Sequence, residues 1–246
     1  MAPKAFIQYK DLIFQKLKKA FAQENQILQA AQMIAESLGK GGWIYISGTG
    51  HSHMFAEEIF YRAGGFARVI PILDSALMLH ESASKSTEIE RKEGYAAEIM
   101  KPYTLTENDI FIIASNSGRN AVSIELALHA NSKGAKTICI TNLAHSNSVE
   151  SRHSSNKKLF QIADLFLDNC GEIGDAGISI PGLSLKVGAT STVIGVAILQ
   201  AIMVQAATIL VEYGIRPEVF NSSNSNEGEE ENDALLAKYK PMVKIL

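Results

Sequence analysis

Short apolar runs alternate with amphipathic segments along the middle of this chain. Five runs have the length and the polar or glycine boundaries of buried strands: 43–46, 68–72, 109–114, 136–141 and 163–167. Helical periodicity fills three of the intervening segments: 52–63, 87–101 and 120–133. Because buried strands that alternate with helices form parallel sheets, the pattern predicts an α/β fold with a five-stranded, doubly wound parallel sheet.

Two further helical patterns flank this alternation. An apolar stripe through Leu17, Phe21 and Leu28 predicts one long amphipathic helix over about 4–38. Near the other end, Val187–Val211 contains 25 residues without a charge, which is long enough to cross a bilayer. Threonine and glutamine residues interrupt this segment and its flanks lack aromatic belts, so we expect a buried core helix and no contact with a membrane.

Composition sets the scale of the protein. Its 246 residues are 46% hydrophobic and 20% charged, which suits one large domain with a single core. We therefore predict one domain over 1–246 with its core at about 43–213. The tail at 214–246 contains an acidic Asn/Ser run, typical of a solvated linker, and then a short helical pattern at 234–239.

Charge and cysteine usage limit the partners and the location. The net charge of -3 provides no basic surface for nucleic acid. Cys139 lies in an apolar run and Cys170 stands alone in a polar loop, so the chain has no C-x-x-C pair. No apolar signal segment opens the sequence, and we therefore expect a cytoplasmic protein.

Two of the predicted strands end in loops rich in serine and glycine. The run at 43–46 continues into Ser47–Ser52, the run at 109–113 continues into Ala114–Asn120, and a helical pattern follows each loop. Backbone N–H groups at a helix N-terminus attract anions, and serine hydroxyls add donors. For a single loop of this kind, an ordinary helix N-cap is an equally good explanation. The recurrence of the loop after two strands predicts a phosphate site.

The loops do not match nucleotide-binding motifs. His53 occupies the position of the third glycine in G-x-G-x-x-G, and G-K-[ST] does not occur. His51 and His53 begin a helical pattern two positions apart, so their side chains point about 200° apart and do not easily share an ion. We expect neither a cofactor nor a metal ion.

The same loops resemble the SIS, or sugar isomerase, domain family. Ser47–Ser52 is similar to the G-x-G-x-S motif, Ser115–Asn120 to S-x-S-G-x-[ST], and Lys186–Thr192 to the opening of the long C-terminal helix. The resemblance implies a three-layer, flavodoxin-like sandwich of strand order 2-1-3-4-5, with both loops facing one crevice at the switch point. It also implies a sugar-phosphate ligand, held by Gly48, Ser52, Ser115, Asn116, Ser117, Gly118, Asn120 and Thr190.

Within that family, the chain looks like an isomerase-like subfamily related to N-acetylmuramic acid 6-phosphate etherase and phosphoheptose isomerase. Arg119 is similar to an arginine of the etherase branch, whereas Asn120 departs from the usual Ser or Thr. Family members usually form dimers, and the apolar helices also favour a homodimer or a tetramer. The first etherase motif is not reproduced, so the chain looks more like a separate SIS subfamily than like any named enzyme, and an isomerase is the leading interpretation.

Aldose–ketose isomerisation needs a base that moves a proton between adjacent carbons and an acid that opens the sugar ring. His80 and Glu81 follow the second predicted strand, in a region where similar isomerases carry His and Glu. Glu90 and Glu93 are rival carboxylates, although an ordinary charged helix face also explains them. An etherase-like lyase and a non-catalytic sugar-phosphate sensor are the two alternative functions.

Overall fold

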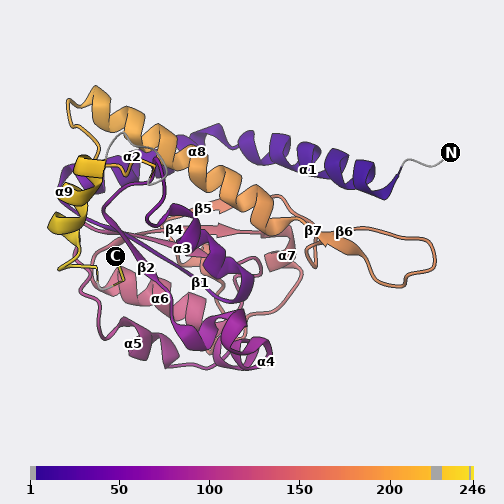
Figure 1. The fold of residues 1–246 in the computed structure, drawn as a ribbon. Helices are drawn as coiled ribbons and strands as arrows, with labels where there is room; N and C mark the ends of the chain where they lie inside the picture. Colours follow the sequence, from indigo (N-terminus) through magenta and orange to yellow (C-terminus); the bar gives the residue numbers. More distant parts are fainter. Residues whose placement is uncertain (1–3, 223–228, 244) are drawn as a thin grey trace.

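A computed structural model describes residues 4–222, 229–243 and 245–246. Its centre is a five-stranded parallel sheet in the order β2-β1-β3-β4-β5 (Figure 1). The strands are β1 (Ile44–Gly48), β2 (Val69–Ile72), β3 (Ile110–Ala114), β4 (Lys136–Thr141) and β5 (Leu165–Asp168). The predicted fold class, the five strands and the strand order are confirmed.

Alternate residues of the strands enter two cores, one on each face of the sheet. Ile112 and Ile140 belong to one core, and Phe111 and Cys139 belong to the other. The first core also contains side chains of α2 (Glu24–Gly39), α3 (Met54–Ile59) and α8 (Ser191–Glu212). The second contains side chains of α5 (Tyr95–Met100) and α6 (Ala121–Ser132). Helices therefore cover both faces of the sheet, which makes the sandwich three-layered.

The N-terminal segment forms two helices, so the prediction of one long helix over 4–38 is wrong. Helix α1 (Ala5–Phe21) ends at Ala22, and α2 begins after Gln23, whose φ of -82° and ψ of 48° are not helical. The Gln23 amide donates to the Asp168 carbonyl oxygen at 2.7 Å and accepts from the Asp168 N–H at 2.9 Å. Because this pairing continues the hydrogen-bonding edge of β5, it offsets the loss of helix at Gln23.

Two predicted helices are also shorter than their sequence patterns. The segment at 52–63 consists of a 3-10 turn, Gly50–His53, and α3, and Tyr61 then takes a left-handed φ of 44°. The segment at 87–101 is divided between α4 (Leu79–Ile89) and α5 by Gly94, whose φ is 83°. The extended Phe60, with φ of -88° and ψ of 132°, ends α3 before Tyr61, and the left-handed Gly94 is the N-cap residue at which α5 begins.

The remaining elements are short. They are α7 (Leu143–Asn147), the 3-10 turns Ser75–Leu77 and Leu159–Gln161, the antiparallel pair β6 (Ala176–Ile178) and β7 (Val187–Ala189), and α9 (Glu229–Tyr239). The sequence prediction misses the β6–β7 hairpin, and its expected helix over Val187–Val211 is wrong at the start, because Val187–Ala189 form β7 and α8 begins at Ser191. The acidic linker predicted after residue 220 lies partly at 223–228, outside the described residues, and from Glu229 on it is helical.

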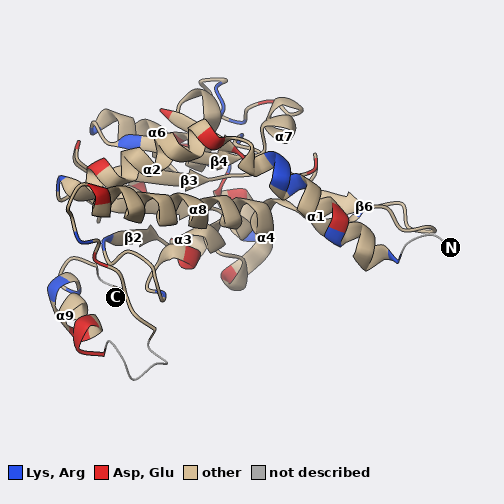
Figure 2. Cartoon of the chain, turned by 90° about the horizontal axis from the view of Figure 1, so that it is seen from above, with Lys and Arg blue, Asp and Glu red and all other residues tan. Residues whose placement is uncertain are grey.

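Helix α8 is the segment that raised the question of a membrane. Among the described helices it is long and apolar enough to cross a bilayer, but half of its most apolar window is buried inside the protein. It crosses the molecule as a tan, almost uncharged rod (Figure 2), and Ile194, Ile198 and Ile202 are buried in the same core as α2. Helix α8 thus has one side in the core, as the sequence predicts, while its other side keeps exposed apolar residues such as Val204.

Candidate functional site

The loop after β1 turns back tightly on the end of the strand. A Cβ atom at Gly48 would lie 2.2 Å from the carbonyl oxygen of Ser52, so no larger residue fits there. The Ser52 N–H donates to the Thr49 carbonyl oxygen at 3.0 Å, which closes the turn. Gly48 and Ser52 are therefore brought together, as the motif implied, with Ser52 half-buried at the turn.

The loop after β3 is held from inside by its own residues. The Ser115 hydroxyl accepts from the Gly118 N–H at 3.2 Å, and Gly118 has the left-handed φ of 58°. The carbonyl oxygen of Asn116 accepts from the Asn142 N–H at 3.0 Å, and its side-chain oxygen accepts from the Asn169 amide at 3.0 Å. Ser115 and Asn116 thus fix the loop against β4 and β5.

Several donors of this loop have no acceptor. In the described part of the chain, the Ser117 hydroxyl and the backbone N–H groups of Asn116 and Ser117 make no hydrogen bond. Asn120 is the N-cap residue of α6, but its side chain makes no capping hydrogen bond. Free donors therefore surround the positive end of a 12-residue helix, an arrangement that favours an anion.

Buried atoms without a partner cluster around the same loop. Among the described residues, the buried side-chain atoms that lack a hydrogen bond are Arg119 Nε, Ser123 Oγ and Ser146 Oγ. Ser123 lies in the first turn of α6, and Ser146 Oγ lies 3.4 Å from the position of a Cβ at Gly118. Buried polar groups are normally paired, so these atoms, at a loop with free donors, are groups that a ligand or an ordered water would satisfy.

The two loops are neighbours because their strands are. Gly48 of β1 is in register with Ala114 of β3, so both loops leave the sheet side by side. Glu90 connects them: its carboxylate accepts from the Thr49 hydroxyl at 2.6 Å, and its carbonyl oxygen accepts from the Val122 N–H at 3.2 Å. The half-buried carboxylate of Glu90 therefore lies at the β1 loop, and the backbone of the same residue contacts the first turn of α6.

His80 and Glu81 lie beside the first loop at the start of α4, and both are exposed. Their side chains keep 63% and 59% of their accessible surface, and His80 Nε2 is 3.8 Å from Glu81 Oε1. The His80 ring meets the ring of His53 edge-on at 6.5 Å between centroids. The structure thus brings this predicted pair to the β1 loop, in contact with solvent.

Glu93 has partners of a different kind. Its carboxylate accepts from the Ser154 N–H at 2.6 Å and from the Ser154 hydroxyl at 2.9 Å. These two hydrogen bonds lower the pKa of Glu93, which weakens it as a proton acceptor. Glu93 thus fastens the loop at 149–158 to the segment between α4 and α5.

The same place offers a set of metal-ligating groups that the sequence did not reveal. Ligand atoms of Glu93, Glu125 and His153 lie within 4.8 Å of one another. The Glu125 carboxylate also accepts from the Gly94 N–H at 2.7 Å, and His153 Nε2 is 3.7 Å from Glu125 Oε1. All three groups already have protein partners, which accounts for their proximity without a metal ion.

Thr190, the last predicted phosphate residue, lies at the N-terminus of α8 and is fully buried. Its hydroxyl donates to the carbonyl oxygen of Asp175 at 2.9 Å and accepts from the Glu172 N–H at 3.0 Å. The Asp175 carboxylate accepts from the N–H groups of Thr190 at 2.9 Å and Ser191 at 2.7 Å. An acidic side chain of the chain itself therefore occupies the positive end of α8.

A pocket at the amino ends of the strands, opposite these loops, is lined by acidic side chains that have a structural role. Its lining includes Asp109 and Asp164, which lie where β3 and β5 begin. The Asp109 carboxylate accepts from the Trp43 N–H at 2.8 Å and the Thr106 N–H at 2.6 Å. Since ligands of open α/β sheets bind at the carboxyl ends of the strands, we place the candidate site at the loops after β1 and β3.

Comparison with known proteins assigns the class. A family model described as the SIS domain matches residues 8–142. A phosphoheptose isomerase from Francisella tularensis has a similar structure, with a TM-score of 0.57, 15% identity, and coverage of 85% of this chain and 99% of that chain. At this identity the similarity supports the fold alone. The chain belongs to the SIS domain family.

Its relatives define the family more narrowly. A UPF0309 protein of Halalkalibacterium halodurans is 45% identical over 217 residues, which cover 88% of this chain and 90% of that protein. A UPF0309 protein of Thermoanaerobacter pseudethanolicus is 42% identical over 245 residues, which cover 98% of this chain and 99% of that protein. At this level of identity and coverage, the chain is a member of the UPF0309 family.

Proposed function

We propose that this protein binds a sugar phosphate at the loops after β1 and β3 and interconverts its aldose and ketose forms. The free donors of Asn116 and Ser117 at the N-terminus of α6 carry this proposal. A phosphate dianion accepts several hydrogen bonds at once and suits the positive end of a helix. The matching SIS model and the isomerase-like fold support a phosphosugar as the bearer of that phosphate.

Glu90 is the carboxylate best suited to move the proton. The Thr49 hydroxyl fixes its side chain at 2.6 Å, at the loop that would hold the ligand. A base must be held within hydrogen-bond reach of the carbon-bound proton, which favours Glu90 over the exposed Glu81. Glu93 is the weakest candidate, because Ser154 occupies its carboxylate. His80 and Glu81, which are exposed beside the β1 loop, are assigned to ring opening.

The sensor and the lyase differ from the isomerase in what they need at this site. A sensor needs the phosphate donors but no carboxylate fixed beside them. The Thr49–Glu90 hydrogen bond therefore favours an enzyme. A lyase would use the same carboxylate, and exchange of the C2 proton without formation of the isomeric sugar would point to it.

We also propose a homo-oligomer in the cytoplasm, assembled through an apolar face. This face consists of α1, the outer side of α8 and the β6–β7 hairpin, and α1 and the hairpin extend together beyond the sheet (Figure 1). Large apolar side chains on it remain exposed: 64% for Phe14, 67% for Val204 and 74% for Leu185. Such a face is typical of a surface that a second copy covers. Light scattering that gives a monomeric mass at micromolar concentration would contradict the oligomer.

The experiment is a thermal-shift screen of pentose, hexose, heptose, amino-sugar and muramic acid phosphates, each beside its unphosphorylated sugar. Binding to the native state raises the unfolding temperature, so only the phosphates should stabilise the protein. Hits are then incubated in deuterated water, and exchange at C2 and formation of the isomer are measured. Stabilisation by the free sugars alone would contradict the phosphate site, and binding without exchange would replace the isomerase with a sensor.

A further inference from the structure

The arginines of this chain divide into two groups. The sequence has six of them, and Arg62, Arg68 and Arg216 each pair with a glutamate: Glu58, Glu218 and Glu231 respectively. Arg91, Arg119 and Arg152 make no ion pair with any carboxylate of the described residues. The three unpaired arginines come from three separate segments of the chain.

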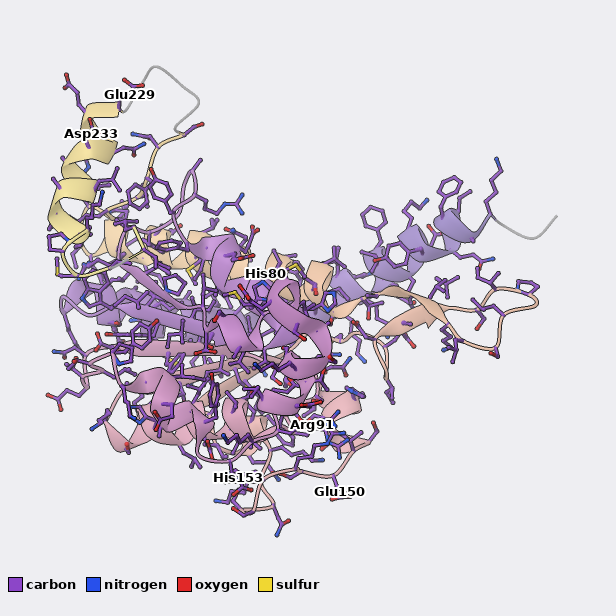
Figure 3. The ribbon with its side chains drawn as sticks, turned by 60° about the horizontal axis from the view of Figure 1, so that its bottom comes forward. His80, Arg91, Glu150, His153, Glu229 and Asp233 are labelled. Atoms are coloured by element: carbon purple, nitrogen blue, oxygen red, sulfur yellow. The ribbon has the colours of Figure 1, made fainter. Side chains whose placement is uncertain are left out.

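Those three arginines meet at the N-terminus of α6. Arg119 immediately precedes the N-cap residue Asn120, and its carbonyl oxygen accepts from the Arg152 N–H at 2.8 Å. The Arg152 guanidinium donates to the Asn120 side-chain oxygen at 3.0 Å. Arg91 follows Glu90, whose carbonyl oxygen bonds the first turn of α6. Figure 3 shows Arg91 on the same side of the molecule as Glu150 and His153, which flank Arg152 in the chain.

Their mutual charges are not balanced by the protein. Burial comes first among the causes that lower the pKa of Arg152, and the positive charges of Arg119 and Arg91 follow. Glu90 acts in the opposite direction. The neighbouring carboxylates Glu93 and Glu125 have hydrogen-bond donors of their own. Around the Arg152 guanidinium the protein therefore places two further positive charges and the carboxylate of Glu90, next to a helix end that is itself positive.

We propose that the ligand of this site is a sugar phosphate with a second acidic group, and that Arg91, Arg119 and Arg152 bind that group. This inference rests on the proposed function. The free donors of the β3 loop are sufficient to bind one phosphate group, so the three arginines are available for a second acidic group. The buried and unpaired Nε of Arg119 shows that one guanidinium edge lacks an acceptor. The planar fork of arginine matches a carboxylate or a second phosphate in two parallel hydrogen bonds.

The test compares each of two sugar phosphates with a related compound that carries a second acidic group. Dissociation constants are measured by calorimetry for glucose 6-phosphate and 6-phosphogluconate, and for fructose 6-phosphate and fructose 1,6-bisphosphate. Loss of an arginine hydrogen bond to a charged group corresponds to about tenfold in affinity. The wild-type protein should prefer the diacid of at least one pair by about tenfold or more. The pair that shows the preference identifies the second group as a carboxylate or a phosphate.

Arginine variants then locate the preference. R119Q should reduce the ratio of the two affinities by about tenfold, and R91Q, at an exposed position, should reduce it in the same direction. R62Q, whose arginine pairs with Glu58 on α3, is the control and should keep the wild-type ratio. If R119Q does not fold, the affinity ratios of R91Q and R152Q test the assignment in its place.

The possible failures can be told apart. Equal binding of the members of both pairs, with the monophosphates still bound at the β3 loop, overturns the arginine assignment and leaves the proposed function intact. A preference for the diacid that survives all three substitutions also overturns it. If no sugar phosphate of any kind binds, the proposed function fails and this inference fails with it.

Discussion

Helices α6 and α8 both begin at the carboxyl ends of the strands, yet the two N-termini differ in which of their donors already have an acceptor. Helix α6 begins at a loop in which the Ser117 hydroxyl and the N–H groups of Asn116 and Ser117 make no hydrogen bond within the described residues, and arginines without an ion-pair partner among those residues lie beside it. Helix α8 begins at Thr190 and Ser191, whose N–H groups both donate to Asp175. A helix N-terminus is thus a candidate anion site only where no acidic side chain of the protein already accepts its N–H groups. In this sense the end of α6 is open and the end of α8 is closed.

The largest effect is expected at the open end, from the loss of its carboxylate. E90Q keeps the size of the side chain and a hydrogen-bonding oxygen but cannot accept a proton at neutral pH. Isomerisation and C2 exchange of the best ligand should fall by about two to four decades, the usual scale for a general base, while its affinity stays close to that of wild type. The matched variant E93Q should retain activity. Wild-type exchange in E90Q would remove Glu90 from the mechanism.

The next effect separates the two helix ends by affinity. S117A removes a free hydroxyl at α6 and should weaken sugar-phosphate binding by about 1–3 kcal/mol, the range for hydrogen bonds to charged groups. T190V alters a hydroxyl that already bonds Asp175, so it should leave affinity unchanged while reducing stability. S132A, at the far end of α6, is the control. Equal losses of affinity in S117A and T190V would show that both ends contact the phosphate.

A smaller effect concerns the closed end by itself. D175N removes the negative charge at the N-terminus of α8 but suits the left-handed φ of 72°. Urea unfolding should show a loss of about 1 kcal/mol, because a charged residue at a helix N-terminus contributes on this scale. Ligand affinity should not change. An increase in sugar-phosphate affinity in D175N would mean that Asp175 had been competing with the phosphate for α8.

The smallest effect is a titration that reports on both ends. Burial lowers the pKa of His145; the nearby Asp175 raises it, and Arg119 lowers it further. Proton NMR should therefore find a lower pKa for His145 in D175N and a higher one in R119Q. Bound sugar phosphate should raise it, since the ligand offsets the charge of Arg119. Identical titration in all these samples would contradict the proximity of His145 to the two regions.

The lowered pKa of His145 also predicts how the stability of the protein changes with pH. A histidine whose folded pKa lies below its unfolded value of 6.5 contributes stability that is complete above that value. The contribution is lost as the pH falls through the folded pKa. H145Q should thus lose less stability than wild type between pH 7 and pH 5, a window set by the ordinary value of 6.5.

The sheet could be predicted from sequence because its strands are local apolar runs between polar loops. The break between α1 and α2 could not, since Ala22 and Gln23 carry no proline or glycine signal. A tertiary contact of Gln23 with Asp168 produces it, 145 positions away. The β6–β7 hairpin is short and only partly buried, so burial imposes no regular alternating pattern on it.

The candidate site could likewise be predicted only in part from the sequence. The serine and glycine loops are contiguous motifs, and their residues could be named in advance. The cap on α8 could not be predicted, because Asp175 lies 15 positions before Thr190 and only the β6–β7 hairpin brings the two residues together. Arg91, Arg119 and Arg152 are scattered along the chain, and only the fold brings them together. Charged residues that look like ordinary surface in a sequence become a cluster when three loops meet.

The most direct test of the central claim is a map of backbone amide shifts in a titration with the best sugar phosphate, with its unphosphorylated sugar as reference. Amide resonances report which N–H groups meet the phosphate. We predict phosphate-dependent shifts at Asn116, Ser117 and Asn120, and around the β1 loop at Ser52, with little change at Thr190. Shifts centred on Thr190 and Ser191 instead, with the β3 loop unchanged, would contradict the assignment of the open helix end.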